Sequence, residues 1–312
     1  MIYTLTLNPA LDHIILVDNE IELGVTNYYN EDYSVIGGKG INAAIILNNL
    51  NADVKAIGIL GKSNQNMFLD KFKEIKLKNS FFINEGSTRV NYKIKNLKMK
   101  QETELNGLGF NAEQKNLDSI KDFFESNLKE NDIVVLTGSI AKGITNDIYK
   151  VIGKIVKEKR SLLVCDCTKD LLTNVLEVKP YLIKPNLEEI CATLKISFRD
   201  DFSLDEIKKL VNELKSMGAE NVLLSMGSKG SMFFANNNDI YKVGVAKGKL
   251  VNSVGAGDSM LAGFVYGLHN NLSIEDTLKY AAASGGATAF TEWLANKEQI
   301  YSLVNQIEVN KI

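Results

Sequence analysis

The sequence contains few of the residues on which several classes of protein depend. Of its 312 residues only three are cysteine, three are proline and two are histidine. Cys165 and Cys167 lie two positions apart, Cys191 stands alone, and no Cys/His partner set completes a disulfide framework or a zinc site. We therefore expect buried, reduced thiols. His13 and His269 have no neighbours that suggest a catalytic triad or a metal site.

The chain also lacks any strong charge imbalance and any long apolar run. Its formal net charge is −2, whereas a nucleic-acid surface needs a basic face. No window approaches the roughly 20 uninterrupted apolar residues of a membrane span. The opening MIYTLTLNPALD alternates like a strand and has neither the basic nor the apolar region of a signal peptide. We expect a cytoplasmic protein that binds neither nucleic acid nor membrane.

Short apolar runs alternate with amphipathic stretches over most of the chain. Such alternation predicts a mainly parallel sheet with helices on both faces, an α/β fold whose ligands bind at the carboxyl ends of the strands. The expected strands are residues 132–139, 161–166, 180–186 and 221–227, and the expected helices are residues 112–128, 146–159 and 203–218.

Two N-terminal regions, residues 13–36 and 87–107, have a different pattern of short alternating strands with polar faces. They predict a small antiparallel sheet that is solvated on one side and projects over the ligand rim as a lid. Because no linker or low-complexity tract separates it, we expect one domain, residues 1–312, with an embedded β lid. The solvated face of this lid offers a surface for a homodimer.

Two nucleotide-binding motifs can be set aside. GLGFNA, residues 107–112, fits the dinucleotide fingerprint, but that fingerprint requires a buried strand before it and the preceding KMKQETELN is polar. A P-loop sequence is absent as well. Neither a dinucleotide-dependent oxidoreductase nor a P-loop enzyme is favoured.

A glycine motif, GGKGIN, precedes an apolar helical pattern. Gly37 and Gly38 allow the backbone to approach a ligand closely, and the N-terminus of the following helix attracts anions. Lys39 adds positive charge, and Asn42 points to the same place from the first turn. A glycine turn before a core helix is the structural alternative.

The stretch VNSVGAGDSMLAGF, residues 251–264, combines a Gly–Ala–Gly run with an aspartate at the start of a helix. Gly255, Ala256 and Gly257 can form a nest of N–H groups that binds phosphate oxygens, and Asp258 is then placed to accept a proton from an attacking hydroxyl. A simple helix cap is the alternative. The helix also carries Gly263, and each helical glycine costs about 1 kcal/mol, so we expect compensation by close packing against residues 280–290.

Taken in order, TLNPALD, GGKGIN, KPNLEE, SMGSKG and VNSVGAGDSMLAGF resemble the ribokinase-like, phosphofructokinase-B family of sugar kinases. The resemblance runs from residue 2 to about residue 292. It implies a ribokinase-like three-layer α/β fold with a β lid, and ATP-dependent phosphorylation with Mg²⁺ as cofactor. Small-molecule partners follow from it: ATP and a ketohexose phosphate.

The resemblance also implies roles for individual residues. Asp258 matches the catalytic base, and Val254, Gly255, Ala256 and Gly257 match the anion hole. The positions that match the sugar side are Asp12, Gly37, Gly38, Lys39, Asn42, Arg89, Asn91 and Ser139. Those that match the nucleotide side are Lys184, Asn186, Ser225, Gly227, Gly230 and Val254, and Asn186 and Glu189 match the Mg²⁺ site.

Lys39 and Arg89 favour a substrate that already carries a phosphate, because arginine binds phosphate with a bidentate fork. Within the family the chain is most similar to the 1-phosphofructokinase branch, which implies transfer to O6 of fructose 1-phosphate to give fructose 1,6-bisphosphate. Tagatose-6-phosphate kinases share nearly every motif and are the alternative, and a catalytically silent sugar-phosphate sensor is a further one. Phe110 and Ala141 occupy positions where the family usually has proline.

Overall fold

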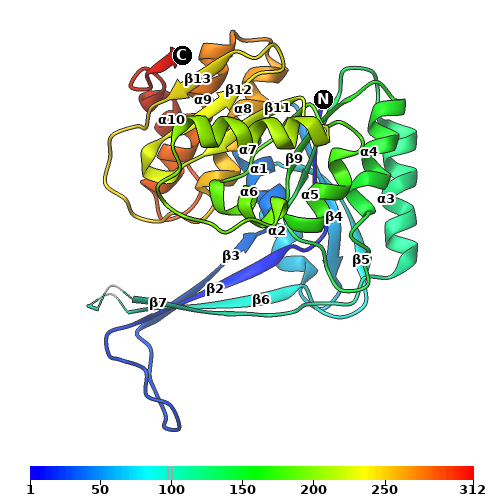
Figure 1. Ribbon diagram of the computed structural model, residues 1–312. Coiled ribbons are helices and arrows are strands. Elements are labelled where there is room, and N and C mark those ends of the chain that lie inside the picture. The colour runs from blue at the N-terminus through cyan, green and yellow to red at the C-terminus, as the bar shows by residue number, and fades with distance from the viewer. Residues whose placement is uncertain (97, 100) are drawn as a thin grey trace.

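The computed structural model describes residues 1–96, 98–99 and 101–312. They form a three-layer body and a smaller second sheet that projects from it (Figure 1). The strands of the large sheet, in spatial order, are β14 (Val309–Lys311), β13 (Ile240–Val243), β12 (Ser231–Phe234), β11 (Asn221–Ser225), β10 (Leu182–Ile183), β9 (Leu162–Asp166), β8 (Ile133–Thr137), β1 (Ile2–Thr6), β4 (Val54–Gly61) and β5 (Lys78–Asn84).

This large sheet is mainly parallel, as the sequence predicts. Neighbouring strands from β11 to β5 pair in parallel, whereas β12, β13 and β14 continue the sheet as an antiparallel edge. Each of the four expected body strands is present within its predicted range. The carboxyl ends of the parallel strands therefore share one rim of the sheet.

Helices cover both faces of the large sheet, which confirms the three-layer prediction. One face packs against α1 (Lys39–Asn49), α2 (Gln65–Glu74), α8 (Ala256–His269), α9 (Ile274–Ala289) and α10 (Lys297–Val304). The other packs against α3 (Gln114–Asn127), α4 (Ile148–Glu158), α5 (Lys169–Leu176), α6 (Leu187–Leu194) and α7 (Leu204–Met217). Strand β8 supplies both cores, because Ile133 and Val135 join the first cluster while Val134 and Leu136 join the second.

The close contact between α8 and α9 accounts for the glycines of α8. A Cβ atom on Gly263 would lie 2.3 Å from the carbonyl oxygen of Tyr280, and one on Gly267 would lie 2.6 Å from Oγ1 of Thr277. Any side chain at these positions would force the two helices apart. The predicted packing against residues 280–290 is thus confirmed.

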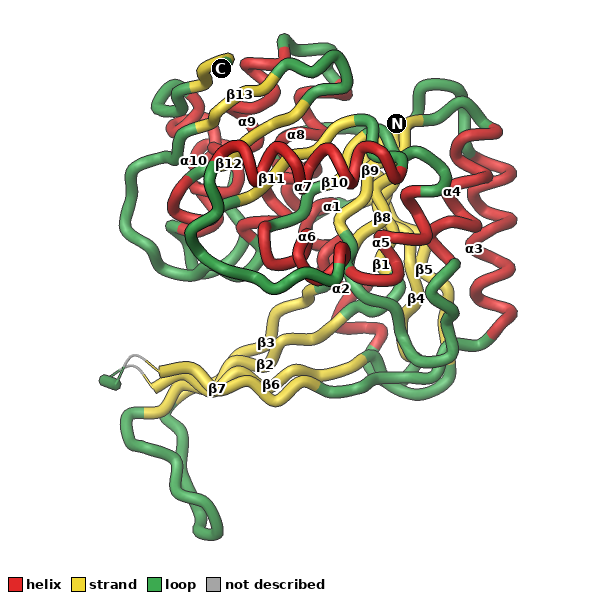
Figure 2. Tube along the Cα trace, in the orientation of Figure 1, coloured by secondary structure: helices red, strands yellow, loops and turns green. Residues whose placement is uncertain are grey.

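The second sheet consists of β3 (Glu31–Gly37), β2 (Ala10–Val17), β6 (Arg89–Asn96) and β7 (Gln101–Asn106), in that order. Figure 2 shows it extending from the body, with a long loop between β2 and β3. The prediction of a purely antiparallel sheet was wrong, because β2 and β6 pair in parallel. Strand β2 follows β1 and strand β6 follows β5, and both segments leave the body at the same rim of the large sheet. The two strands therefore run in the same direction.

Four further features of the sequence can be compared with the structure. Strand β7, before GLGFNA, is exposed along its whole length, so the buried strand of a dinucleotide fingerprint is missing there. Cys165 and Cys167 are free thiols in one core cluster, and burial raises the pKa of both. Phe110 and Ala141 are buried in the same cluster.

Among the described residues no helix combines the length and apolar character that a membrane span requires.

Candidate active site

A cleft of about 450 Å³ lies between the carboxyl ends of the body strands and the second sheet. This volume falls within the usual range of small-molecule sites. Of the residues that the sequence singles out, the cleft is lined by Asp12, Gly38, Lys39, Asn42, Arg89, Asn91, Lys184, Asn186, Glu189, Ser225, Val254, Gly255, Gly257 and Asp258. Residues separated by more than 200 positions are thus brought to one place.

The start of α8 forms one wall of this cleft. Gly255, the N-cap, has φ 79° and ψ −6°, a left-handed conformation that favours glycine, and no side chain caps the helix. The N–H of Ala256 donates to the carbonyl of Ser253 and that of Val254 donates to Oδ1 of Asn252. Among the hydrogen bonds of the described residues, the N–H groups of Gly255 and Gly257 have no acceptor and remain available to an anion.

Asp258 follows these glycines and is buried, with 8% of its surface exposed. Its Oδ2 accepts a hydrogen bond of 2.8 Å from Nδ2 of Asn42, on the first turn of α1, and does not cap its own helix. Burial, together with the negative charge of Asp166, raises the pKa of Asp258 to about 6. A carboxyl group with such a pKa is ionised at neutral pH and is a suitable general base.

Two lysines converge on a buried carboxylate beside Asp258. Asp166, at the end of β9, contacts Nζ of Lys39 through Oδ1 and Nζ of Lys184 through Oδ2, both at 3.2 Å. Burial alone would raise the pKa of Asp166, but the two ammonium groups lower it below its usual value. The pKa of Lys39 is raised, because the carboxylates of Asp166, Asp258 and Glu189 outweigh the effect of burial. The cluster therefore presents two fixed cations to the cleft.

The second sheet contributes a polar group on the opposite wall. Asp12 and Asn91 are paired residues of the parallel strands β2 and β6. Nδ2 of Asn91 donates to Oδ1 of Asp12 at 2.8 Å, and Nζ of Lys93 lies 3.3 Å from Oδ2 of Asp12. Oδ1 of Asn91 is buried and has no hydrogen-bond partner among the described residues. This wall offers acceptors and a donor of the kind that hydroxyl groups need.

Arg89 begins β6 at the same end of the cleft. Its Nε donates to the carbonyl of Pro9 and its Nη2 donates to the carbonyl of Asn8, both at 3.3 Å. These bonds fix the guanidinium and leave further N–H donors. Nδ2 of Asn8 also donates to Oγ of Ser139, which is exposed just after β8. These contacts gather hydrogen-bond donors that fit a phosphate group.

Asn186 and Glu189 form a capping box at the start of α6. Oδ1 of Asn186 accepts from the N–H of Glu189 at 2.7 Å, and Oε2 of Glu189 accepts from the N–H of Asn186 at 2.9 Å. Both side chains therefore have a structural function, while Glu189 also lines the cleft and its Oε1 has no protein partner among the described hydrogen bonds. In the described part of the chain no three acidic, histidine or cysteine side chains cluster as a ready metal cage.

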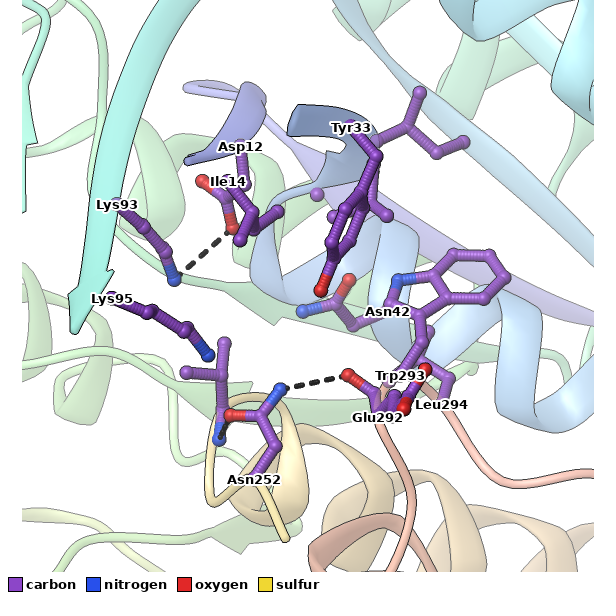
Figure 3. A pocket seen from close by; sticks show the side chains of 14 residues that line it. Asp12, Ile14, Tyr33, Asn42, Lys93, Lys95, Asn252, Glu292, Trp293 and Leu294 are labelled. Carbon is purple, nitrogen blue, oxygen red and sulfur yellow. Dashed lines mark hydrogen bonds and ion pairs between the residues drawn. The ribbon is translucent and has the colours of Figure 1, made fainter. Parts of the chain in front are cut away.

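Of the other residues singled out by the sequence, Gly37, Gly227 and Gly230 are not among those that line the cleft, although Ser225 is. Ser225 ends β11, Gly227 begins the short helical turn η1 (Gly227–Lys229) that follows, and Gly230 comes directly after this turn. Gly37 lines a smaller cavity of about 40 Å³ that adjoins the cleft at Asp12 and Asn42. Figure 3 shows that cavity between Tyr33 of β3 and the segment that carries Glu292, Trp293 and Leu294.

Sequence reasoning missed several residues that line the cleft: Ala10, Lys93, Glu104, Asn106 and Asp166. A signal for Asp166 existed, because it ends a predicted buried strand whose carboxyl end belongs to the ligand rim. Lys93 follows Asn91 by two positions, so strand alternation places it on the same face. Glu104 and Asn106 reach the cleft through the pairing of β6 with β7, which the sequence pattern does not specify.

Comparisons with known proteins agree with this geometry. Residues 6–297 match the family described as pfkB family carbohydrate kinase. The chain is 36% identical to 1-phosphofructokinase of Bacillus subtilis and 33% identical to a tagatose-6-phosphate kinase of Staphylococcus epidermidis, each alignment covering 100% of both chains. A solved structure, a putative phosphofructokinase from Staphylococcus aureus, superposes with a TM-score of 0.85 at 32% identity and covers 100% of this chain and 99% of that one.

Proposed function

Because this chain belongs to the pfkB family of carbohydrate kinases, we propose that it transfers the terminal phosphoryl group of ATP to O6 of fructose 1-phosphate, giving fructose 1,6-bisphosphate. The observation that carries this proposal is the position of Asp258. This buried carboxylate lies next to two lysines and to two backbone N–H groups that have no acceptor among the described residues. The full-length likeness to 1-phosphofructokinase supports the choice of sugar.

Asp258 acts as the general base. Its carboxylate, oriented by Asn42, accepts the proton of the sugar hydroxyl as that oxygen attacks the phosphorus. A positioned base typically contributes a factor of about 10² to 10⁴ to the rate. Asn42 also keeps Asp258 away from the helix N–H groups, so that these can serve the phosphoryl group.

The anion hole and the two lysines stabilise the charge of the transferred group. Phosphoryl transfer depends on positioning and charge stabilisation more than on covalent chemistry. The N–H groups of Gly255 and Gly257 supply fixed dipoles, and loss of one such donor typically costs about 3–4 kcal/mol. Asp166 holds Lys39 and Lys184 on either side of its carboxylate, so neither ammonium group must be reoriented during the reaction.

The sugar phosphate lies along the second sheet, which acts as a lid. Its existing phosphate is bound by Arg89 and Ser139, and its ring hydroxyls by Asp12 and Asn91. This arrangement directs the far end of the sugar, the O6 hydroxyl, toward Asp258. Gly37 and Gly38 bring the backbone of the glycine motif close to the sugar.

ATP occupies the other half of the cleft. Val254, Ser225 and the turn of Gly227 and Gly230 flank the nucleotide, and Lys184 lies beside its phosphates. Asn186 and Oε1 of Glu189, which has no partner among the described hydrogen bonds, would hold Mg²⁺, an ion that usually keeps several waters and takes one or two protein carboxylates. When bound, it neutralises charge on the ATP phosphates.

An ADP-release assay tests the proposal and separates its alternatives. The purified protein is incubated with ATP, Mg²⁺ and, in parallel, fructose 1-phosphate, fructose 6-phosphate or tagatose 6-phosphate. We expect the highest kcat/KM with fructose 1-phosphate. Highest kcat/KM with tagatose 6-phosphate would identify the alternative kinase, and binding of a sugar phosphate without ADP release would identify a silent sensor.

The outer face of the lid supports a homodimer. Tyr92 and Leu105 pair across β6 and β7 and are 44% and 59% exposed. Burying such apolar surface against a second lid is favourable. Since both substrates are phosphorylated metabolites, we also propose a cytoplasmic location.

A further inference from the structure

Lys93 occupies an unusual position in the lid. Lysine is almost never fully buried unless it is paired, and Lys93 is only 7% exposed. It lines the main cleft and also the smaller adjoining cavity. Figure 3 shows its ammonium group directed at the carboxylate of Asp12.

The partners of Lys93 leave part of its hydrogen-bonding capacity unused. Its Nζ lies 3.3 Å from Oδ2 of Asp12 and 3.5 Å from Oε1 of Glu104, which is its cross-strand partner on β7. An ammonium group has three N–H donors, so two carboxylates leave one donor for a further acceptor. The cleft is where such an acceptor would lie.

The neighbouring groups complete a row of complementary donors and acceptors. Asn91 is only 7% exposed and donates to Asp12, while its Oδ1 has no hydrogen-bond partner among the described residues. A Cβ atom on Gly37 would lie 3.5 Å from Oδ2 of Asp12, so the glycine leaves that oxygen accessible. The row thus contains an acceptor on Asn91, a carboxylate on Asp12 and a donor on Lys93, which matches adjacent hydroxyls that both donate and accept.

We propose that Lys93 determines sugar specificity. It orients the Asp12 carboxylate and donates to a secondary ring hydroxyl of the ketohexose phosphate, so that the site distinguishes between the two configurations of that hydroxyl. This proposal rests on the proposed function. A site that pairs a hydroxyl with buried polar groups rejects a sugar whose hydroxyl points elsewhere, because those groups are then left unpaired.

A structural function for Lys93 alone explains less. Lys95, two residues further on the same face, pairs with Glu102 at 3.5 Å, and its side chain is 23% exposed. A partly exposed ion pair such as Lys95 with Glu102 is enough to keep this face of the lid polar. Burying Lys93 between two carboxylates has a desolvation cost that an apolar side chain would avoid. Binding of a sugar hydroxyl beside Asp12 accounts for a lysine at this position.

The test compares two sugars that differ only in the configuration at C4, fructose 1-phosphate and tagatose 1-phosphate. KM and kcat are measured for the wild type, Lys93→Met and the matched control Lys95→Met, with thermal unfolding of each protein. For Lys93→Met we expect KM for fructose 1-phosphate to rise at least tenfold, kcat to stay within threefold, and KM for ATP to stay within twofold. The ratio of kcat/KM for fructose 1-phosphate to kcat/KM for tagatose 1-phosphate should fall at least fivefold in Lys93→Met, while Lys95→Met keeps the wild-type values.

Other outcomes are equally informative. An unchanged epimer ratio in Lys93→Met, or the same loss in Lys95→Met, would overturn the assignment. If Lys93→Met does not fold, Lys93→Gln replaces it, since glutamine keeps a donor but loses the charge. The same fivefold fall in the epimer ratio is then expected for Lys93→Gln. If the wild type prefers 6-phosphates, fructose 1-phosphate as substrate is refuted while the Lys93 comparison proceeds with fructose and tagatose 6-phosphate. Absence of turnover with all four sugars would overturn both proposals.

Discussion

Replacement of Asp258 by asparagine should make the protein more stable and nearly inactive at once. The structure raises the pKa of this carboxyl from an ordinary 3.8 to about 6, mainly through burial. A group whose pKa is raised in the folded state stabilises the fold below its unfolded pKa, and that contribution is lost as the pH rises through the folded pKa. The ionised carboxylate of the active form is therefore a stability cost.

The cost follows from the two pKa values. A difference of about 2 units at 1.36 kcal/mol per unit corresponds to about 3 kcal/mol at pH 8, and to about half of that at pH 5. Asparagine has nearly the same shape and still accepts a hydrogen bond from Asn42. Asp258→Asn should thus raise the free energy of unfolding of the ligand-free protein by up to about 3 kcal/mol at pH 8.

Urea unfolding at the two pH values measures this gain, and an ADP-release assay measures the loss of kcat, which we expect to be about 10² to 10⁴-fold. Asp122→Asn, which removes an exposed carboxylate on α3, is the control and should change stability by less than about 0.5 kcal/mol. In the wild type, kcat/KM should fall on the acid side of about pH 6. A variant no more stable than the wild type at pH 8, or one with near-normal turnover, would refute the reasoning.

Three further changes probe other parts of the site. Arg89→Ala should raise KM for fructose 1-phosphate at least tenfold and leave KM for ATP within twofold; an equal rise in both excludes Arg89 as the phosphate anchor. Asp166→Asn removes a negative charge that raises the pKa of Asp258, so the acid limb of the kcat/KM profile should move to lower pH, and a limb that stays in place argues against this coupling. Leu105→Glu on the outer lid face should convert a dimer to a monomer in small-angle scattering, whereas Met67→Glu, an equally simple change of an exposed apolar residue on α2, should not; a wild-type monomer would contradict the lid dimer.

Much of the body could be predicted because its signals are local. Buried parallel strands are short apolar runs and their helices are amphipathic, so residues 133–137 or 204–217 are recognisable without knowledge of their neighbours. The glycine-rich starts of α1 and α8 are local signals as well. The direction of β2 relative to β6 is not local, because it depends on where two separate excursions leave the body, and there the sequence-based expectation was wrong.

The sequence by itself determined which chemical groups the protein has: a glycine-flanked aspartate, an asparagine and a glutamate three positions apart, and an arginine in the second sheet. Tertiary structure alone decided which of these act together. Asp166 reaches Lys39 and Lys184 because the carboxyl ends of parallel strands share one rim, and Lys93 reaches Asp12 because two strands separated by about 80 residues pair in register. Burial and charge, which exist only after these elements meet, give Asp258 in the first turn of α8 the pKa of a base.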